Sequence, residues 1–372
     1  MRVAVIGGAG FIGGHLVDAL LEAGHQVRIL DNLDPQVHPS GKPPDYLDPR
    51  AEFLKQDIRD VDALRTGLAS AEAVYYLAGA VGVGDSMYCI RRYTDVNLLG
   101  CANLLEILAS SKHSVRKLIL SSSVTVYGEG KYACPKHGAV FPDMRPLDRV
   151  ERREWDPPCP KTGCSEHLQP LATDENKPPA PQSIYAITKR AQEEMVLAVG
   201  RAYGLPVTIL RYFNVYGSRQ AISNPYTGVA KIFALHISEG KSPLIYEDGR
   251  QTRDFVHVSD IVRANLLVLN NSNADGEIFN VGSGYPCTVL ELVGHLAKKL
   301  ARSVSPEVAE KFRAGDVRHC FADITKARTL LGYEPRTVIP NGLENLLGSS
   351  VHGAAQLSAA ADAELQRRGL VR

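Results

Sequence analysis

Apolar positions in the first half of the chain follow two alternating patterns. Short β-rich runs are separated by longer segments in which apolar residues recur at helical spacing. Strands are expected at 3–6, 26–30, 52–55, 73–77, 117–121 and 207–210, and helices at 12–22, 61–68, 93–110 and 183–202. Alternation of strands and helices is typical of a parallel sheet with both faces covered. The pattern therefore predicts an α/β fold with a doubly wound parallel sheet.

The rest of the chain departs from this regular alternation. Beyond residue 213 the expected elements are shorter and less regular, which predicts a first domain over 1–212 and a smaller α/β lobe over 213–372. Some segments of the two are expected to interleave, and the Ala-rich stretch 355–368 predicts a helix. Residues 129–182 are rich in Pro, Cys and charge and lack periodicity. Loops of this length inside a compact domain are usually functional or separately organised.

Composition narrows the possible environments and partners. With 44% hydrophobic and 22% charged residues, the 372-residue chain matches an ordinary soluble globular protein. A net charge of +1 indicates no general attraction to nucleic acid or to anionic membranes. No apolar run approaches the roughly 20 residues of a membrane span, and the N-terminus lacks a signal-peptide pattern. We therefore expect a cytoplasmic protein, whose seven cysteines do not indicate a disulfide framework.

A glycine-rich loop follows the first expected strand and opens the first helix. Gly7, Gly10 and Gly13 give a G-x-x-G-x-x-G spacing, with Phe11 and Ile12 inside it. Such a turn lets the backbone approach a pyrophosphate at a helix N-terminus, as in Rossmann-type domains. Asp31 closes the second strand, where a carboxylate can bind the ribose hydroxyls of NAD and repel the 2′-phosphate of NADP. The alternative for Asp31 is a turn cap, since Asn32 follows it.

Two further motifs carry candidate acid–base chemistry. Tyr185 and Lys189 are four residues apart, which places them on one face of a helix. A free tyrosine has a pKa near 10, and a neighbouring ammonium together with the charge of an oxidised nicotinamide is expected to lower it. Upstream, the serines at 121–123 end a strand, where a hydroxyl could bind the reacting sugar oxygen. Taken alone, a serine cluster is more often turn and capping chemistry.

Together these motifs resemble the extended short-chain dehydrogenases/reductases that act on nucleotide-sugars, over residues 1–128 and 183–340. The resemblance implies that Ser123, Tyr185 and Lys189 are catalytic. It implies further cofactor contacts at Asn32, Asp57, Ile58, Leu77, Ala78, Gly79 and Asn97, and also at Tyr185 and Lys189. It implies substrate contacts at Ser123, Val124, Thr125, Asn214, Asn224, Arg253 and Arg313. The planar guanidinium of arginine suits the substrate diphosphate because it donates hydrogen bonds in pairs.

The same resemblance favours one reaction within the family. Relatives that are 4,6-dehydratases carry Asp-Glu where this chain has Val124-Thr125, and decarboxylases tend to carry an acid at the second position. What remains is NAD-dependent epimerisation of a nucleotide-sugar at C4 through a transient 4-keto sugar. Residues 31–38 and 223–229 resemble dTDP-L-rhamnose 4-epimerases, a group similar to UDP-glucose 4-epimerases, which suggests a dTDP-6-deoxyhexose.

The sequence leaves other functions open. An NAD(P)-dependent reductase or dehydrogenase would share these motifs but release its cofactor, and a decarboxylase is a further alternative. A non-catalytic NAD-binding regulator would lose the Ser–Tyr–Lys set, which is intact here. The resemblance also implies a homodimer that forms through 93–110 and 183–202.

A cysteine pattern in the 129–182 insert suggests a metal. Cys134-Pro135-Lys136-His137-Gly138 is echoed by Cys159-Pro160-Lys161-Thr162-Gly163, followed by Cys164. Thiolates and imidazole are the ligands that tetrahedral zinc prefers. We therefore expect a structural zinc ion held by Cys134, His137, Cys159 and Cys164, with His167 as a spare candidate. The alternative is three free cysteines in a surface loop.

Overall fold

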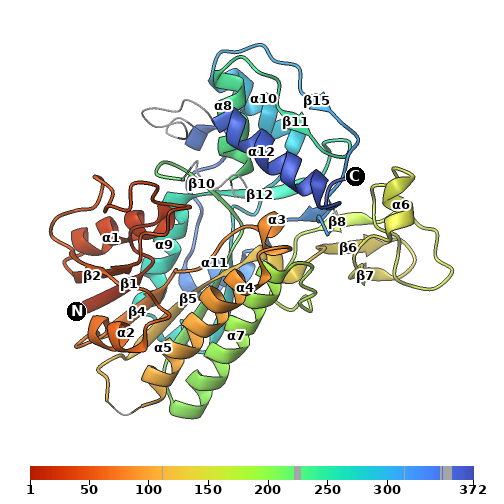
Figure 1. Ribbon diagram of the computed structural model, residues 1–372. Helices are drawn as coiled ribbons and strands as arrows, with labels where there is room; N and C mark the ends of the chain where they lie inside the picture. The colour runs from red at the N-terminus through yellow and green to blue at the C-terminus, as the bar shows by residue number, and fades with distance from the viewer. Residues whose placement is uncertain (111, 222–227, 314, 344–345, 347–353) are drawn as a thin grey trace.

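The computed structural model describes the chain except for residues 111, 222–227, 314, 344–345 and 347–353. Its centre is a seven-stranded, fully parallel sheet in the order β13-β9-β5-β4-β1-β2-β3 (Figure 1). These strands are β1 (Arg2–Ile6), β2 (Gln26–Asp31), β3 (Glu52–Lys55), β4 (Ala73–Tyr76), β5 (Lys117–Ser123), β9 (Val207–Tyr212) and β13 (Glu277–Val281). All six expected strands are confirmed, and the doubly wound α/β fold with them.

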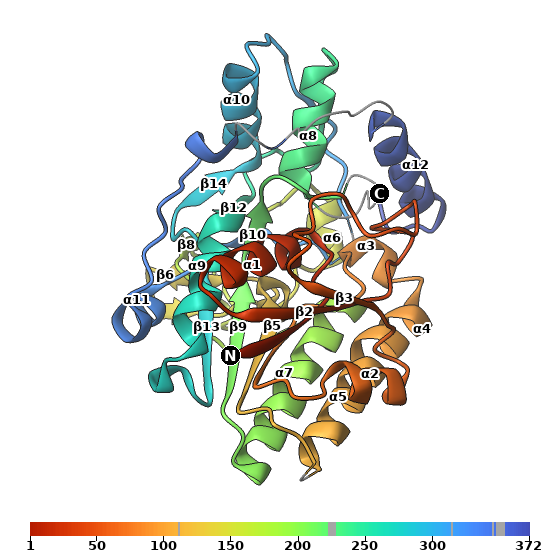
Figure 2. The same cartoon turned by 90° about the vertical axis from the view of Figure 1, so that its left-hand side faces the viewer.

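Helices cover both faces of this sheet (Figure 2). One face packs against α1 (Phe11–Glu22), α9 (Val258–Leu269) and α11 (Thr325–Leu331), and the other against α2 (Val61–Gly67), α5 (Gly100–Ala109) and α7 (Ile184–Tyr203). Side chains alternate along each strand, so Val3 and Val5 enter the first core while Ala4 and Ile6 enter the second. The strands are consequently apolar on both faces, as buried parallel strands are.

The helix expected at 93–110 is not a single regular α-helix. It consists of α4 (Ile90–Tyr93), the π-helical turn η1 (Thr94–Leu99) and α5. The π-helical turn carries the buried Asn97, whose side chain binds both backbone groups of Ala80. Such turns are rare and often occur at functional sites, and sequence periodicity does not reveal them.

A smaller lobe lies above the carboxyl ends of the strands (Figure 1). Its helices are α8 (Val229–Ser238), α10 (Val289–Lys299) and α12 (Ala354–Arg367). Its strands are β10 (Asn214–Tyr216), β12 (Thr252–His257), β14 (Pro286–Thr288) and β16 (His319–Cys320), with a separate pair of β11 (Leu244–Ile245) and β15 (Glu307–Val308). Phe233, Phe255 and Leu292 lie in its core. Because β13 belongs to the central sheet, and α9 and α11 pack on it, the chain beyond residue 213 contributes to both lobes.

The insert contains regular structure that its sequence does not predict. β6 (Lys131–Cys134) pairs antiparallel with β7 (Gly138–Val140) and β8 (Gln169–Leu171), and the short α6 (Leu147–Glu151) follows β7. The remaining short elements are α3 (Val83–Ser86) and the 3-10 turns η2 (Val124–Tyr127), η3 (Ser272–Ala274) and η4 (Asn341–Leu343). Among the described helices, none has the length and apolar character that a bilayer span requires.

Candidate active site

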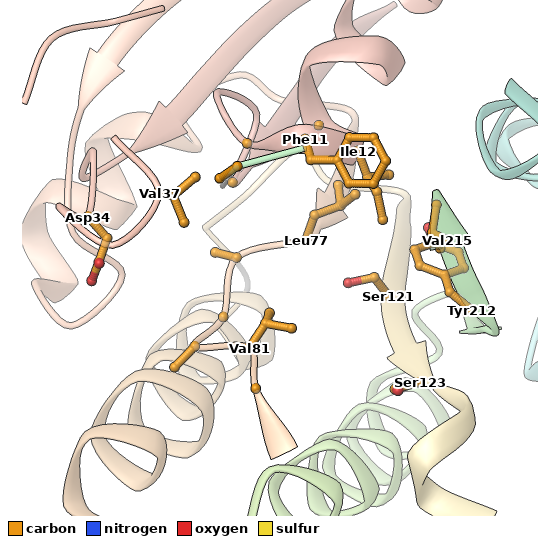
Figure 3. A pocket seen from close by; sticks show the side chains of 18 of the residues that line it. Phe11, Ile12, Asp34, Val37, Leu77, Val81, Ser121, Ser123, Tyr212 and Val215 are labelled. Atoms are coloured by element: carbon orange, nitrogen blue, oxygen red, sulfur yellow. The ribbon is translucent and has the colours of Figure 1, made fainter. Parts of the chain in front are cut away.

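A pocket of about 430 Å³ lies at the carboxyl ends of the central strands (Figure 3). In open α/β sheets, ligands bind outside this edge. Most of the residues selected from sequence line it. They are Gly7, Gly10, Phe11, Ile12, Gly13, Asp31, Asn32, Asp57, Ile58, Leu77, Ala78, Gly79, Ser123, Val124, Thr125, Tyr185, Lys189 and Asn214.

The glycine-rich loop fits a pyrophosphate because its backbone is packed too closely for side chains. Gly7 has a φ of +84°, and a Cβ there would lie 2.6 Å from the backbone nitrogen of Ala78. A Cβ on Gly13 would lie 2.2 Å from the carbonyl oxygen of Gly7. The N-cap of α1 is Gly10, so no side chain caps the first N–H groups of this 12-residue helix. Those donors and the positive end of the helix dipole suit an anion.

Asp31 combines the two roles considered from sequence. Its carboxylate accepts hydrogen bonds from the backbone N–H groups of Ala9 (3.1 Å) and Leu33 (2.9 Å), so it does cap a turn. It also lines the pocket. Burial raises the pKa of Asp31, and these backbone donors and His38 oppose the shift.

A second carboxylate holds the next part of the pocket wall. Asp57 accepts a hydrogen bond from the side-chain amide of Asn32 (3.0 Å) and pairs with Arg59 (2.7 Å). Hydrogen bonding to Arg59 is the main reason that the pKa of Asp57 lies well below its usual range. The loops after β2 and β3 are therefore tied together by a charged carboxylate.

The helix α7 carries the Tyr–Lys pair to the end of β5. Its N-cap is Ser183, whose hydroxyl accepts a hydrogen bond from the Ala186 N–H at 3.1 Å. Lys189 donates to the carbonyl oxygen of Ser121 at 2.8 Å. Burial lowers the pKa of Lys189 to about 8 and raises the pKa of Tyr185 to about 12, although a hydrogen bond from Ser123 opposes the latter shift.

The expected lowering of the Tyr185 pKa depends on the oxidised nicotinamide as well as on Lys189, so it stays a prediction for the cofactor-bound protein. In the chain without cofactor the pKa of Tyr185 is raised instead. Desolvation of the phenolate outweighs the favourable contacts, since the ring is buried and the Lys189 ammonium is itself disfavoured by burial.

The three serines at the end of β5 have different partners. Ser121 donates to the Tyr76 carbonyl oxygen (3.0 Å) and Ser122 to Glu193 (2.6 Å). Ser123 instead lines the pocket together with Tyr185, opposes the rise of the Tyr185 pKa, and accepts a hydrogen bond from the Thr125 hydroxyl at 3.0 Å. Strand alternation and the η2 turn thus separate two structural serines from the candidate catalytic one.

Four of the selected residues are not in the described pocket wall. Asn97 is buried behind it, where it binds Ala80 (2.8 and 3.1 Å) and the Thr188 hydroxyl (3.0 Å). Arg253 donates to Asp316 (3.0 Å) and to the Val317 carbonyl oxygen (2.6 Å). The guanidinium of Arg313 lies over the Tyr246 ring, with 4.9 Å to the ring centre. Asn224 lies outside the described residues.

Comparison with known proteins identifies the architecture that this geometry belongs to. The sequence model of the NAD dependent epimerase/dehydratase family matches residues 3–146 and 163–282. The chain belongs to this family. Residues 147–162, which the family model does not match, lie inside the insert.

Several relatives in this family are similar to this chain over most of its length. A dTDP-L-rhamnose 4-epimerase of Burkholderia thailandensis is 32% identical over 93% of each chain. The UDP-glucose 4-epimerase structure of Thermotoga maritima, with UDP-glucose, has a TM-score of 0.76 and 34% identity, covering 93% of this chain and 97% of that one. That of Thermus thermophilus, in complex with NAD, has a TM-score of 0.74 and 29% identity, covering 94% and 100%.

Sequence reasoning missed several pocket residues in this family member. Val37 and Val81 follow β2 and β4 and line the pocket with Tyr212 (Figure 3). Arg92 also lines it and pairs with Asp34 at 3.1 Å. Their position just beyond the strand ends was a usable signal for the first two. No local motif indicates Arg92, because its pairing with Asp34 joins segments 58 residues apart.

Proposed function

We propose that the protein is an NAD-dependent nucleotide-sugar epimerase that inverts C4. The observation that carries this proposal is the meeting of Ser123, Tyr185 and Lys189 in one pocket with the glycine-rich loop. The names of the relatives, which include 4-epimerases for dTDP- and UDP-sugars, support it. When bound, the nicotinamide of NAD would accept a hydride from the sugar and return it.

The residues of the chain have distinct parts in this reaction. Gly7 and Gly13 would leave room for the cofactor pyrophosphate, and Asp31 would accept hydrogen bonds from its ribose. Tyr185 takes the proton of the 4-hydroxyl group while Ser123 hydrogen-bonds the same oxygen. Since burial raises the pKa of Tyr185 to about 12, the phenolate needs further stabilisation, which the positive charge of a bound, oxidised nicotinamide would supply.

Thr125 bears on what happens to the oxidised sugar. Its hydroxyl donates to Ser123 at 3.0 Å and is no base for removing a C5 proton. The 4-keto sugar is therefore expected to be reduced again rather than dehydrated, and the proposal favours epimerisation over the dehydratase chemistry of the family.

The diphosphate of the substrate has candidate partners at the boundary of the two lobes. Asn214 lines the pocket, and a phosphate oxygen would accept a hydrogen bond from its side-chain N–H₂ group. Arg253 is occupied by Asp316, so binding a phosphate would require it to exchange one acidic partner for another. Arg313 and Asn224 complete the proposed set.

An incubation without added NAD tests the proposal. Purified protein is mixed with dTDP-, UDP- and GDP-sugars that carry deuterium at C4. An epimerase interconverts two sugars catalytically and keeps the label at C4, because the same hydride returns. Conversion limited to one equivalent of sugar per enzyme points to a reductase. Release of CO₂ from a uronic acid sugar points to a decarboxylase, and absence of turnover with every sugar points to a regulator. Loss of label to solvent would contradict hydride return.

The proposal extends to substrate, domains and assembly. We favour dTDP-L-rhamnose or a related dTDP-6-deoxyhexose as substrate. Residues 1–212 are proposed to bind the cofactor and 213–372 the nucleotide-sugar, with α9, β13 and α11 of the second range interleaved with the first domain. A homodimer through η1–α5 and α7 is also proposed, since these adjacent helices expose Leu99 and Ile187. Sedimentation of the wild type beside Ile187→Glu tests it: a monomeric wild type contradicts the dimer.

A further inference from the structure

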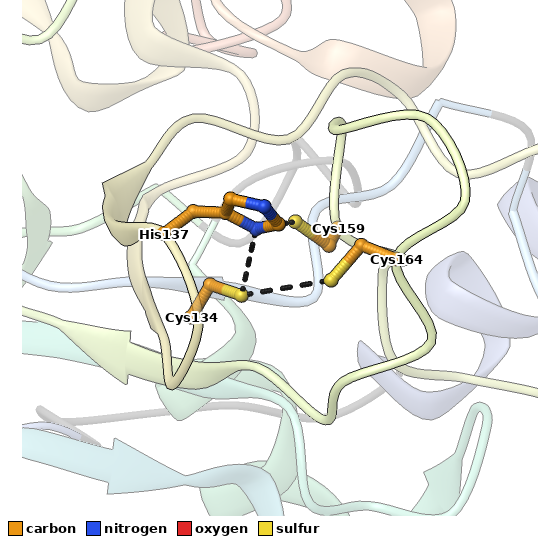
Figure 4. A group of neighbouring side chains, drawn as sticks. All are labelled: Cys134, His137, Cys159 and Cys164. Atoms are coloured by element: carbon orange, nitrogen blue, oxygen red, sulfur yellow. Dashed lines mark hydrogen bonds between the residues drawn. The ribbon is translucent and has the colours of Figure 1, made fainter.

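Three thiols and an imidazole meet in the insert, away from the active site (Figure 4). Cys134 ends β6 and His137 lies in the turn after it, whereas Cys159 and Cys164 come from a second loop. Their candidate ligand atoms all lie within 4.8 Å of one another. These are the four residues whose sequence pattern suggested a metal, and the proposed reaction uses none of them.

Three of the six separations between these atoms are close to those of a tetrahedral zinc centre. Zn–S bonds of about 2.3 Å and Zn–N bonds of about 2.1 Å place two sulfurs about 3.8 Å apart and a sulfur and a nitrogen about 3.6 Å apart. The Cys134 and Cys164 sulfurs are 3.7 Å apart. The Nδ1 atom of His137 lies 3.3 Å from the Cys134 sulfur and 3.6 Å from the Cys159 sulfur. We propose that these four side chains bind one zinc ion.

The two loops that present the ligands are similar tight turns. The His137 N–H donates to the Cys134 carbonyl oxygen (3.2 Å), and the Cys164 N–H donates to that of Lys161 (3.0 Å). Gly138 and Gly163 have φ values of +67° and +74°, which glycine adopts without strain. The two turns therefore present Cys134 with His137 from one loop and Cys164 from the other.

Two simpler explanations fit the geometry less well. A disulfide would bring two sulfurs to about 2.05 Å, much closer than the 3.7 Å between Cys134 and Cys164. Apolar packing accounts for Cys134 and Cys159, which are buried with Tyr132, Val140 and Leu168. It does not account for the exposed His137, whose ring nitrogen is directed at two sulfurs and gains nothing from apolar contact.

The site would be structural, because all four ligands come from the protein and no position is left for substrate. The buried residues of the insert, Tyr132, Cys134, Val140, Cys159 and Leu168, form a very small hydrophobic core. A bound metal can therefore supply folding free energy that this core lacks. The ordered insert in turn supports the second lobe. Glu129 accepts hydrogen bonds from the backbone of Arg318 (2.9 Å) and His319 (2.8 Å), and Arg145 pairs with Glu247 (2.7 Å).

Metal analysis of the full-length protein, purified without chelator or affinity metal, is the first test. About one zinc per chain is expected, as in other four-ligand structural sites. Protein refolded with Co²⁺ should show the intense visible absorption of a tetrahedral thiolate centre. Folded wild-type protein without zinc that also fails to take up added Zn²⁺ or Co²⁺ would overturn the proposal. A Cys134–Cys164 disulfide found by mass spectrometry in unreduced protein would do the same.

Matched variants assign the ligands. His137→Ala should bind zinc at least about tenfold more weakly, while His137→Cys supplies a fourth thiolate and should retain it. Cys287→Ser is the control, because Cys287 lies in β14 outside the cluster and serine keeps a donor for the Thr288 carbonyl oxygen. Equal zinc affinity in His137→Ala and the wild type would show that His137 is not a ligand. Zinc loss in Cys287→Ser would place the metal elsewhere.

Discussion

Replacement of Lys189 by methionine should show how much burial of the Lys189 ammonium lowers the free energy of unfolding. The Lys189 side chain is buried, and burial lowers the pKa of its ammonium from 10.5 to about 8. Methionine has a similar length and no proton to lose. We therefore expect Lys189→Met to change the pH dependence of folding stability, in addition to abolishing turnover.

The sign and size follow from proton linkage. Between about pH 8 and pH 10.5 the folded wild type has released the Lys189 proton while the unfolded chain retains it. The stability contribution of Lys189 is therefore fully present above pH 10.5 and is lost as the pH falls through about 8. A fall in pKa from 10.5 to about 8 corresponds to about 3 kcal/mol. Relative to Lys189→Met, the wild type should gain about this amount as the pH rises from 7 to 10.5.

Urea unfolding of both proteins, freed of nucleotide, measures this difference at each pH. Groups that titrate equally in the two proteins cancel in the comparison. Lys298→Met is the control, since Lys298 is exposed on α10 and its charge stays in water in both states. Parallel stability curves for the wild type and Lys189→Met would refute the reasoning, because the ammonium would then be solvated in the folded protein.

Three further predictions concern the pocket. NAD should bind more tightly than NADP, since Asp31 would repel a 2′-phosphate; equal or tighter binding of NADP in a calorimetric titration would contradict this. Tyr185→Phe should lower kcat by about 10²- to 10⁴-fold and leave NAD affinity unchanged, because only the proposed proton acceptor is removed; near-normal turnover would show that another group is the base. Gly13→Ala should fold but lose NAD binding, since its Cβ would lie 2.2 Å from the Gly7 carbonyl oxygen; unchanged affinity in the same titration would mean that the loop adjusts freely.

Local sequence patterns were sufficient to predict most of the central sheet and its covering helices. Glu52–Lys55 is β3 with the predicted bounds, and α1 and α7 begin within one residue of the expected positions. Apolar runs and helical periodicity are set by which face must be buried, so they can be read from neighbouring residues. The glycine-rich loop could also be predicted from the sequence, because only glycine fits where the backbone segments approach most closely.

Long-range contacts decided what the sequence could not. The strand β13 joins the sheet beside β9, and its partner residues lie about 69 positions earlier in the chain. Among three adjacent serines, Ser123 is the one that accepts a hydrogen bond from Thr125 and opposes the rise of the Tyr185 pKa. The guanidinium of Arg253 is paired with Asp316. Without cofactor, the pKa of Tyr185 depends on how completely the fold removes water, which motif spacing does not show. A residue pattern names the groups available for chemistry, but burial and distance set their charge and their partners, and both arise only when remote segments pack together.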